Sequence, residues 1–259
     1  MNKQAQAVIL LLVGGAVLRA SLTGQYLNYV KPGLQPYLVA AGAILVLAGA
    51  FTLWYELRGP KHAAAHTEAE EHQTAEEHRE AEEHAHDDDG HGHAHGGPKV
   101  AWLLLAPVLG LLLFAPPALG SYAAGRSGSA VTARSEYAPL PAGDPLRLTM
   151  LDYASRAVFD KGASLGERRI RLTGFAMRGP QDTWLLARMM VSCCAADARP
   201  VKVALGGDLP DGLADQQWID VTGKYSGREL QDEVNGEAIP FIEVSEVTLI
   251  PVPQEQYES

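Results

Sequence analysis

Three long apolar runs constrain the fold of this 259-residue chain more than any other feature of its sequence. The runs are Ala5–Leu22, Leu38–Leu57 and Val100–Leu119. Each holds about 18–20 residues, which is enough for a helix to cross a hydrocarbon core about 30 Å thick. Because backbone groups in lipid must bond within their own segment, we expect three transmembrane helices, with Pro116-Pro117 ending the third. A single soluble globule is therefore excluded.

The first run is also compatible with a signal peptide, since Lys3 supplies a basic start and Ala20 lies near a small-residue cleavage position. Arg19 fits such a cleavage site poorly but can reach the membrane interface from the end of a helix. We favour a transmembrane helix, and in either interpretation the second and third runs cross the membrane.

Basic residues at the ends of the runs predict the orientation. Four flank one side of the membrane and three flank the other: Lys3, Arg58, Lys61 and Lys99 against Lys31, Arg126 and Arg134. This small excess places the N-terminus and residues 61–99 in the cytoplasm. After three crossings, residues 121–259 lie outside. We expect a multi-pass protein of the cytoplasmic membrane, with two helices within residues 1–60, a third within 100–120, and an extracytoplasmic C-terminal domain.

All nine histidines lie within 34 consecutive positions of the segment between the second and third runs. They are His62, His66, His72, His78, His84, His86, His91, His93 and His95. Residues 61–95 also hold 11 acidic residues against two basic ones, so this stretch carries −9 of the chain's net charge of −10. The acidity therefore belongs to a linker over residues 61–99 and says little about the folded parts.

Imidazole and carboxylate groups are ligands for zinc, nickel, cobalt and copper(II). A loose chain of many such ligands binds several ions weakly and exchanges them quickly. The linker therefore predicts multivalent binding of divalent metal ions, with zinc as the first choice. The alternative is a solvated polar tether without a function of its own, but the confinement of every histidine to this segment argues against it.

The C-terminal part divides into a Gly/Ala/Pro-rich linker over residues 121–144 and a small β-rich domain over residues 145–253. The pattern predicts a helix over Thr149–Phe159 with Thr149 as its N-cap. Five strand-like runs follow: Arg168–Arg178, Thr183–Cys194, Pro200–Leu205, Gln217–Tyr225 and Phe241–Ile250. The alternation changes phase at Ser245-Glu246, which predicts a β-bulge. Five short strands and one helix favour a closed, OB-like barrel.

The only two cysteines of the chain are adjacent, Cys193 and Cys194, and Asp197 follows them closely. Two thiolates with a carboxylate oxygen are suited to a thiophilic metal or metalloid ion. Neighbouring side chains on a regular strand point to opposite faces, so joint binding requires the strand to end or bend here. Two alternatives stay open: a redox-active pair or vicinal disulfide, and a structural role in which one cysteine packs in the core.

Several function classes are excluded or disfavoured by composition. The C-terminal domain lacks histidine and therefore a Ser-His-Asp triad, and the chain shows no phosphate-binding loop. No basic, aromatic-rich groove indicates a nucleic-acid partner. Three helices with no buried ionisable residue beyond Arg19 are too few for a transporter by themselves. We expect no catalytic residues, no organic cofactor and no enzymatic activity.

The order of these parts resembles the YcgQ-like bacterial membrane proteins, which are companions of permeases. The resemblance rests on the two N-terminal runs, the His/Asp/Glu-rich insert, the third run ending in Pro116-Pro117, Gly174-Phe175, the stretch from Ser192 to Ala198 with Pro200, and the Trp218…Gly223 strand. It implies an accessory subunit beside a separate multi-span permease in the bacterial cytoplasmic membrane, linked to metal homeostasis. An extracytoplasmic thiol or redox protein and a structural adaptor are the competing hypotheses.

Overall fold

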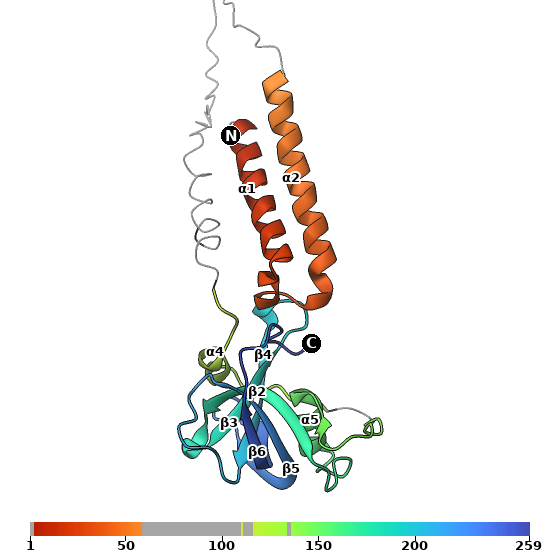
Figure 1. The fold of residues 1–259 in the computed structure, drawn as a ribbon, viewed down its shortest axis with the longest axis vertical. Helices are drawn as coiled ribbons and strands as arrows, with labels where there is room; N and C mark the ends of the chain where they lie inside the picture. The colour runs from red at the N-terminus through yellow and green to blue at the C-terminus, as the bar shows by residue number, and fades with distance from the viewer. Residues whose placement is uncertain (1–2, 59–109, 111–115, 134–135) are drawn as a thin grey trace, which may run out of the picture.

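The computed structural model of the protein describes residues 3–58, 110, 116–133 and 136–259. A hairpin of two long helices stands on a small β-barrel, and the loop end of the hairpin faces the barrel (Figure 1). The N-terminus lies at the far end of the hairpin, whereas the C-terminus lies at the junction with the barrel. The predicted metal-binding linker, residues 61–99, lies outside the described residues.

The helix α1 spans Lys3–Leu22 and α2 spans Gln35–Arg58. Within the described residues, the segments Ala5–Leu22 and Pro32–Arg58 are the two that are long and apolar enough to cross a membrane. The first two predicted spans are thus helices of spanning length. Most of the third predicted span lies outside the described residues, and the predicted count of three is not supported by the described part of the chain.

Small residues at intervals of seven bring the two helices together. Ala7, Gly14 and Ser21 are buried on α1, and Gly42 and Gly49 are buried on α2. A seven-residue period keeps one stripe of each helix facing its partner, and small side chains let the backbones approach closely. The opposite face of α2 is apolar and exposed, as a lipid-facing surface requires. Its most exposed large side chains include Ile44, Leu47, Phe51 and Leu57.

We expect Gly14→Leu to loosen this hairpin. A Cβ at Gly14 would lie 2.9 Å from both the Leu45 Cβ and the Val46 backbone nitrogen, so the helices must move apart. Overpacking of this kind costs about 1–3 kcal/mol. Gly15→Leu is the matched control, because a Cβ at Gly15 meets nothing within 4 Å. Thermal unfolding of the full chain in detergent measures the difference, and equal midpoints for the two variants would contradict this packing.

The barrel consists of five strands, with the order β2-β3-β4-β6-β5 and a closing pair between β5 and β2. The strands are β2 (Ile170–Arg178), β3 (Trp184–Met190), β4 (Arg199–Gly206), β5 (Trp218–Gln231) and β6 (Ala238–Leu249). Neighbours are antiparallel except β4 and β6, which run parallel. The prediction of a five-stranded barrel is confirmed. Because the barrel is closed, each of these five strands has a neighbour on both sides.

The predicted β-bulge is present where β5 pairs with β6. Thr222 lies opposite Glu246 while the next residue, Gly223, lies opposite Val244, so Ser245 is the extra residue. A glycine is needed at the partner position, because a Cβ at Gly223 would lie 2.3 Å from the carbonyl oxygen of Glu243. The bulge allows the long β5–β6 hairpin to bend as the barrel closes.

The predicted helix is α5, Met150–Phe159, and its N-cap is Thr149 as expected. The Thr149 hydroxyl accepts a hydrogen bond from the Asp152 amide at 3.1 Å. The apolar face of α5 joins the core formed inside the barrel, where Met150 and Tyr153 are fully buried. The Tyr153 hydroxyl donates to the Phe241 carbonyl oxygen at 2.6 Å, and burial raises the pKa of this tyrosine.

The boundaries differ from the predicted ones at both ends of the domain. The residues predicted as a linker contain a helix, α4, which spans Ser121–Arg126. A two-residue strand, β1 (Leu146–Arg147), was not predicted and pairs with β2 in parallel. The packed region also continues beyond Pro253, because the C-terminal segment lies along the end of β3. There the Val191 amide donates to the Glu258 carbonyl oxygen at 3.0 Å, and the Glu258 amide donates to the Met189 carbonyl oxygen at 2.9 Å.

Candidate metal centre

The two cysteines lie in a loop that follows β3 at the end of the barrel beneath the helical hairpin. The strand ends at Met190, three residues before Cys193, and a 3-10 turn over Ala195–Asp197 follows. The predicted strand over Thr183–Cys194 was therefore too long, and the bend that joint binding requires is present. The Cys193 and Cys194 sulfur atoms lie 3.6 Å apart, and one carboxylate oxygen of Asp197 lies within 4.8 Å of both.

Asp197 also organises this loop. Its two carboxylate oxygens accept hydrogen bonds from the backbone amides of Ser192 at 3.0 Å and Cys193 at 2.8 Å. The hydrogen bond with the Cys193 side chain and these two amide bonds hold the pKa of Asp197 below its usual range. A carboxylate oxygen has further lone pairs, so these bonds leave acceptor capacity toward a cation.

The protonation of the Cys193 thiol follows from the same geometry. The hydrogen bond to the negative Asp197 carboxylate, and after it the contact with Cys194, raise the pKa of Cys193 to about 11. Cys193 is therefore a protonated thiol at neutral pH. A cation bound between the two sulfurs would replace that proton, since thiolate is the ligand form.

The spacing of the ligand atoms fits a tetrahedral ion. With metal–sulfur bonds of about 2.3 Å, two sulfur ligands of a tetrahedral zinc ion lie about 3.8 Å apart. The separation of 3.6 Å between Cys193 and Cys194 is close to that value. The Asp197 carboxylate oxygen, within 4.8 Å of both sulfur atoms, is the third candidate ligand. Among the residues that the structure describes, Cys193, Cys194 and Asp197 form the one group of this kind.

The redox interpretation fits the same geometry less well. The α-carbons of adjacent residues lie about 3.8 Å apart, below the range of about 4.4–6.8 Å that ordinary disulfides span. Both cysteines are free thiols in the structure. A redox-active cysteine normally has a lowered pKa, whereas that of Cys193 is raised. The interpretation in which one cysteine packs in the core also fits less well, because Cys193 is exposed and Cys194 is only half-buried.

The loop joining α1 to α2 holds this cysteine loop from the side of the hairpin. The Lys31 amide donates to the Cys193 carbonyl oxygen at 3.1 Å, and the Ala195 amide donates to the Tyr29 carbonyl oxygen at 2.7 Å. Between them, Val30 and Cys194 form an isolated antiparallel β-bridge. Two segments more than 160 positions apart in the sequence therefore form one small piece of sheet around the candidate ligands.

Tyr257 links the α1–α2 connection to the segment before α4 at this junction. Its hydroxyl donates to the Asn28 carbonyl oxygen at 3.0 Å and accepts from the Leu119 amide at 2.9 Å. Tyr29 adds a bond from its own hydroxyl to the Pro116 carbonyl oxygen at 3.1 Å. Sequence reasoning missed four residues of this junction, Tyr29, Val30, Lys31 and Tyr257, because no local pattern indicates that the α1–α2 loop pairs with a loop of the barrel.

Family comparisons match both parts of the chain. The model described as the DUF1980 N-terminal domain matches residues 5–130, and the model described as the DUF1980 C-terminal domain matches residues 150–258. The chain belongs to the DUF1980 family. No curated protein and no solved structure matches it. The DUF1980 descriptions carry no activity, so the function has to be argued from the site.

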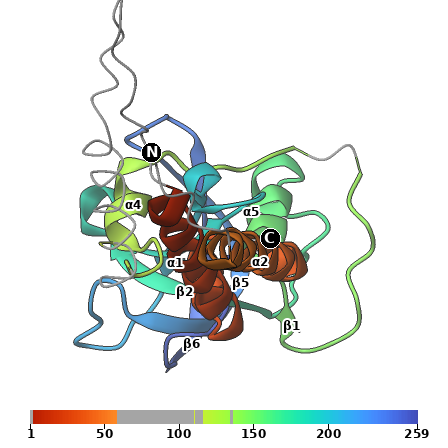
Figure 2. The same ribbon diagram turned by 90° about the horizontal axis from the view of Figure 1, so that it is seen from above.

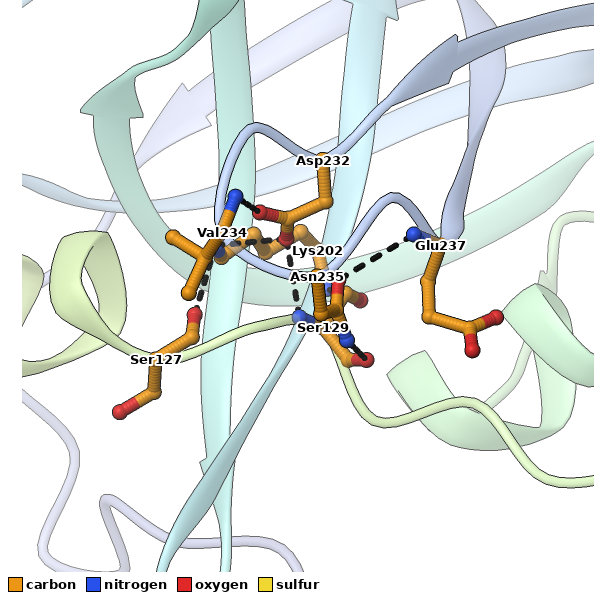
Figure 3. Close-up of polar contacts among 7 residues, drawn as sticks. All are labelled: Ser127, Ser129, Lys202, Asp232, Val234, Asn235 and Glu237. Carbon is orange, nitrogen blue, oxygen red and sulfur yellow. Dashed lines mark hydrogen bonds and ion pairs between the residues drawn. The ribbon is translucent and has the colours of Figure 1, made fainter.

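A second polar cluster in this DUF1980 chain is structural, and it fastens residues 127–130 to the barrel (Figure 3). Lys202 of β4 and Asp232 form an ion pair of 2.8 Å, and their side chains are only 4% and 2% exposed. The Lys202 ammonium also donates to the Ser127 carbonyl oxygen at 2.9 Å. Asp232 accepts from the amides of Ser129 at 2.8 Å and Val234 at 2.9 Å. Burial opposes the charge of Asp232, but these hydrogen bonds outweigh it and lower its pKa.

Proposed function

We propose that this DUF1980 protein is a membrane-anchored accessory protein that binds transition-metal ions beside a separate permease in the bacterial cytoplasmic membrane. One observation carries the proposal: two thiols 3.6 Å apart and a nearby carboxylate lie on the loop that attaches the barrel to the helical hairpin. Thiol and carboxylate ligands together suit zinc and softer ions. The nine linker histidines supply the second metal-binding region of the proposal.

The number of protein ligands favours a site that transfers its ion to a partner over a closed structural site. Structural zinc sites are closed by four protein ligands, whereas sites that exchange a ligand keep one position open. Cys193, Cys194 and Asp197 offer three ligands, and the Cys193 side of the loop is exposed. A partner that supplies the fourth ligand would therefore receive the ion directly. The permease is the proposed partner, because the loop lies next to the membrane-side hairpin.

The arrangement is consistent with the predicted topology. A three-crossing chain puts the α1–α2 loop and the barrel on the same side of the membrane, and the two are in contact here. Seen along the hairpin, α4 lies on the side of α1 and α5 on the side of α2 (Figure 2). The strand order with its parallel β4–β6 pair supports an OB-like barrel. We propose that this barrel and its cysteine loop face the extracytoplasmic space and that the histidine-rich linker faces the cytoplasm.

Cadmium titration of the full chain in mild detergent tests the proposal. Cadmium bound to thiolate gives an ultraviolet charge-transfer band that histidine and carboxylate do not give. We expect this band to saturate at one equivalent, also in a variant with all nine linker histidines replaced by glutamine. Total bound metal, from elemental analysis, should fall in that variant, because the multivalent region is gone. Absence of the band at any cadmium concentration would reject the cysteine site.

The pH dependence of this band checks that the ion displaces a proton. The pKa of Cys193 is raised to about 11, so the thiol is protonated throughout the neutral range. Binding as thiolate must release that proton, so the apparent affinity should rise with pH, by at least about tenfold per pH unit below 11. An affinity independent of pH would exclude Cys193 as a ligand.

Mass spectrometry of proteins that co-purify from native membranes tests the partner, and absence of a multi-span protein would reject the accessory role.

A further inference from the structure

The residues that carry the candidate ligands are the same residues that attach the barrel to the hairpin. Cys193 contributes its side chain to the metal group and its carbonyl oxygen to the Lys31 amide. Cys194 contributes its side chain and, through its backbone, the bridge to Val30. A shift of either cysteine's backbone displaces both its sulfur atom and its bond to the α1–α2 loop, because side chain and backbone share one α-carbon in each residue.

We propose that metal binding at Cys193 and Cys194 is coupled to the attachment of the barrel to the α1–α2 loop, so that the bound ion tightens the junction with the membrane hairpin. This inference rests on the proposed function. The ion fixes both sulfur atoms and with them the backbone of the two cysteines. A fixed backbone keeps the Cys193 carbonyl oxygen and the Ala195 amide facing the loop residues Tyr29 to Lys31.

Coupling of this kind is reciprocal. If the attached state binds the ion more tightly, then the ion must favour the attached state by the same factor. The ion therefore changes how the barrel sits on the helices, which gives the extracytoplasmic domain a means to report metal to a membrane partner. The attachment also depends on Tyr257, whose bonds to Asn28 and Leu119 hold the same junction without touching the ligands.

Lys31→Pro tests the coupling from the side of the hairpin. Proline removes the backbone N–H that bonds to Cys193, and it fits the site because Lys31 has φ −59° and ψ 141°. The preceding residue, Val30, pairs as a strand, which is the conformation that proline requires before it. Lys31→Ala is the control, since it also removes the lysine side chain but keeps the N–H.

Ala195→Pro is a second, independent variant. It removes the donor to the Tyr29 carbonyl oxygen, and Ala195 opens a 3-10 turn, where proline is well accepted. Cys194 before it is extended, with φ −152° and ψ 169°. Ala195→Ser keeps the N–H and serves as its control. Circular dichroism spectra like that of the unmodified chain confirm that each variant is folded.

Two measurements on the full chain in detergent decide the matter. In the cadmium titration, each proline variant should bind about fivefold more weakly than its control, the loss expected for one neutral hydrogen bond. In hydrogen exchange, cadmium should slow the amides of Lys31 and Ala195 in the unmodified chain but not in the Cys193→Ser, Cys194→Ser double variant. Equal affinities within both pairs, or exchange unchanged by cadmium, would overturn the coupling and leave the metal site standing. Failure of the unmodified chain to bind cadmium would overturn both.

Discussion

Asp232→Ala is expected to lower the free energy of unfolding by about 3–5 kcal/mol, the cost of leaving one charge of a buried pair without its partner. The Lys202 ammonium would keep its bond to the Ser127 carbonyl oxygen but lose its counter-ion at a position only 4% exposed. The amides of Ser129 and Val234 would lose their acceptor at the same time. Urea unfolding of the full chain in detergent measures the loss.

Glu167→Ala is the control for this experiment. Glu167 also pairs with a lysine, Lys224, at 3.3 Å, but its side chain is 95% exposed, so the change should cost less than about 1 kcal/mol. The double variant Lys202→Met, Asp232→Leu should be more stable than Asp232→Ala, because it removes both charges together. Equal losses for Asp232→Ala and Glu167→Ala would show that the buried pair does not fasten the chain as described.

The same pair also predicts how stability responds to acid. The pKa of Asp232 is lower in the folded protein than in the unfolded chain. The contribution of Asp232 to the free energy of unfolding is therefore fully present above the ordinary pKa of an aspartate. It is lost as the pH falls through the lowered pKa of the folded protein. Acid unfolding of Asp232→Asn should accordingly show a smaller decline in this window than the unmodified chain does.

Cys193→Ser and Cys194→Ser are each expected to weaken cadmium binding by at least about a hundredfold. Four ligands of a structural zinc site together contribute about 10–16 kcal/mol, which is about 3 kcal/mol for each ligand lost. Asp197→Asn should weaken binding less, because the amide keeps an oxygen toward the loop but loses the charge. The decrease of the thiolate charge-transfer band in the full chain measures all three variants.

Ser192→Ala is the control for the cysteine variants. Ser192 adjoins the pair, and its contact with Asp197 runs through the backbone amide, which alanine retains. The cysteine variants should unfold at nearly the same temperature as the unmodified chain, since Cys193 is exposed and Cys194 is half-buried. If either cysteine variant bound cadmium as tightly as Ser192→Ala, the ion would have other ligands.

The parts of the fold that follow from local pattern were predictable. The Thr149 cap, the helix behind it and the bulge at Ser245 each depend on a few neighbouring residues, and all three are present. The five strands were found for the same reason, although β5 continues to Gln231, six residues beyond the predicted end. The last residues of β5 pair with the first residues of β6, Ala238 to Pro240. The sequence of β5 alone does not show this pairing.

The candidate site was predictable only in its composition. Adjacent cysteines followed by Asp197 stand out in the sequence, and the sequence also showed that binding needs a bend there. What brings the site to the hairpin is the pairing of backbone atoms of Tyr29 and Lys31 with the cysteine loop. Backbone hydrogen bonds between distant segments place few demands on side-chain type, so they leave almost no mark in a single sequence.

The shared piece of sheet between Val30 and Cys194 means that the two family regions are not separable modules. A barrel produced without residues 5–130 would expose the carbonyl oxygen of Cys193, the amide of Ala195 and the hydroxyl of Tyr257 to water. Such a fragment would present the proposed ligands on a loop that lacks its hydrogen bonds to the α1–α2 loop. We therefore expect a cadmium affinity measured on this fragment to differ from that of the full chain.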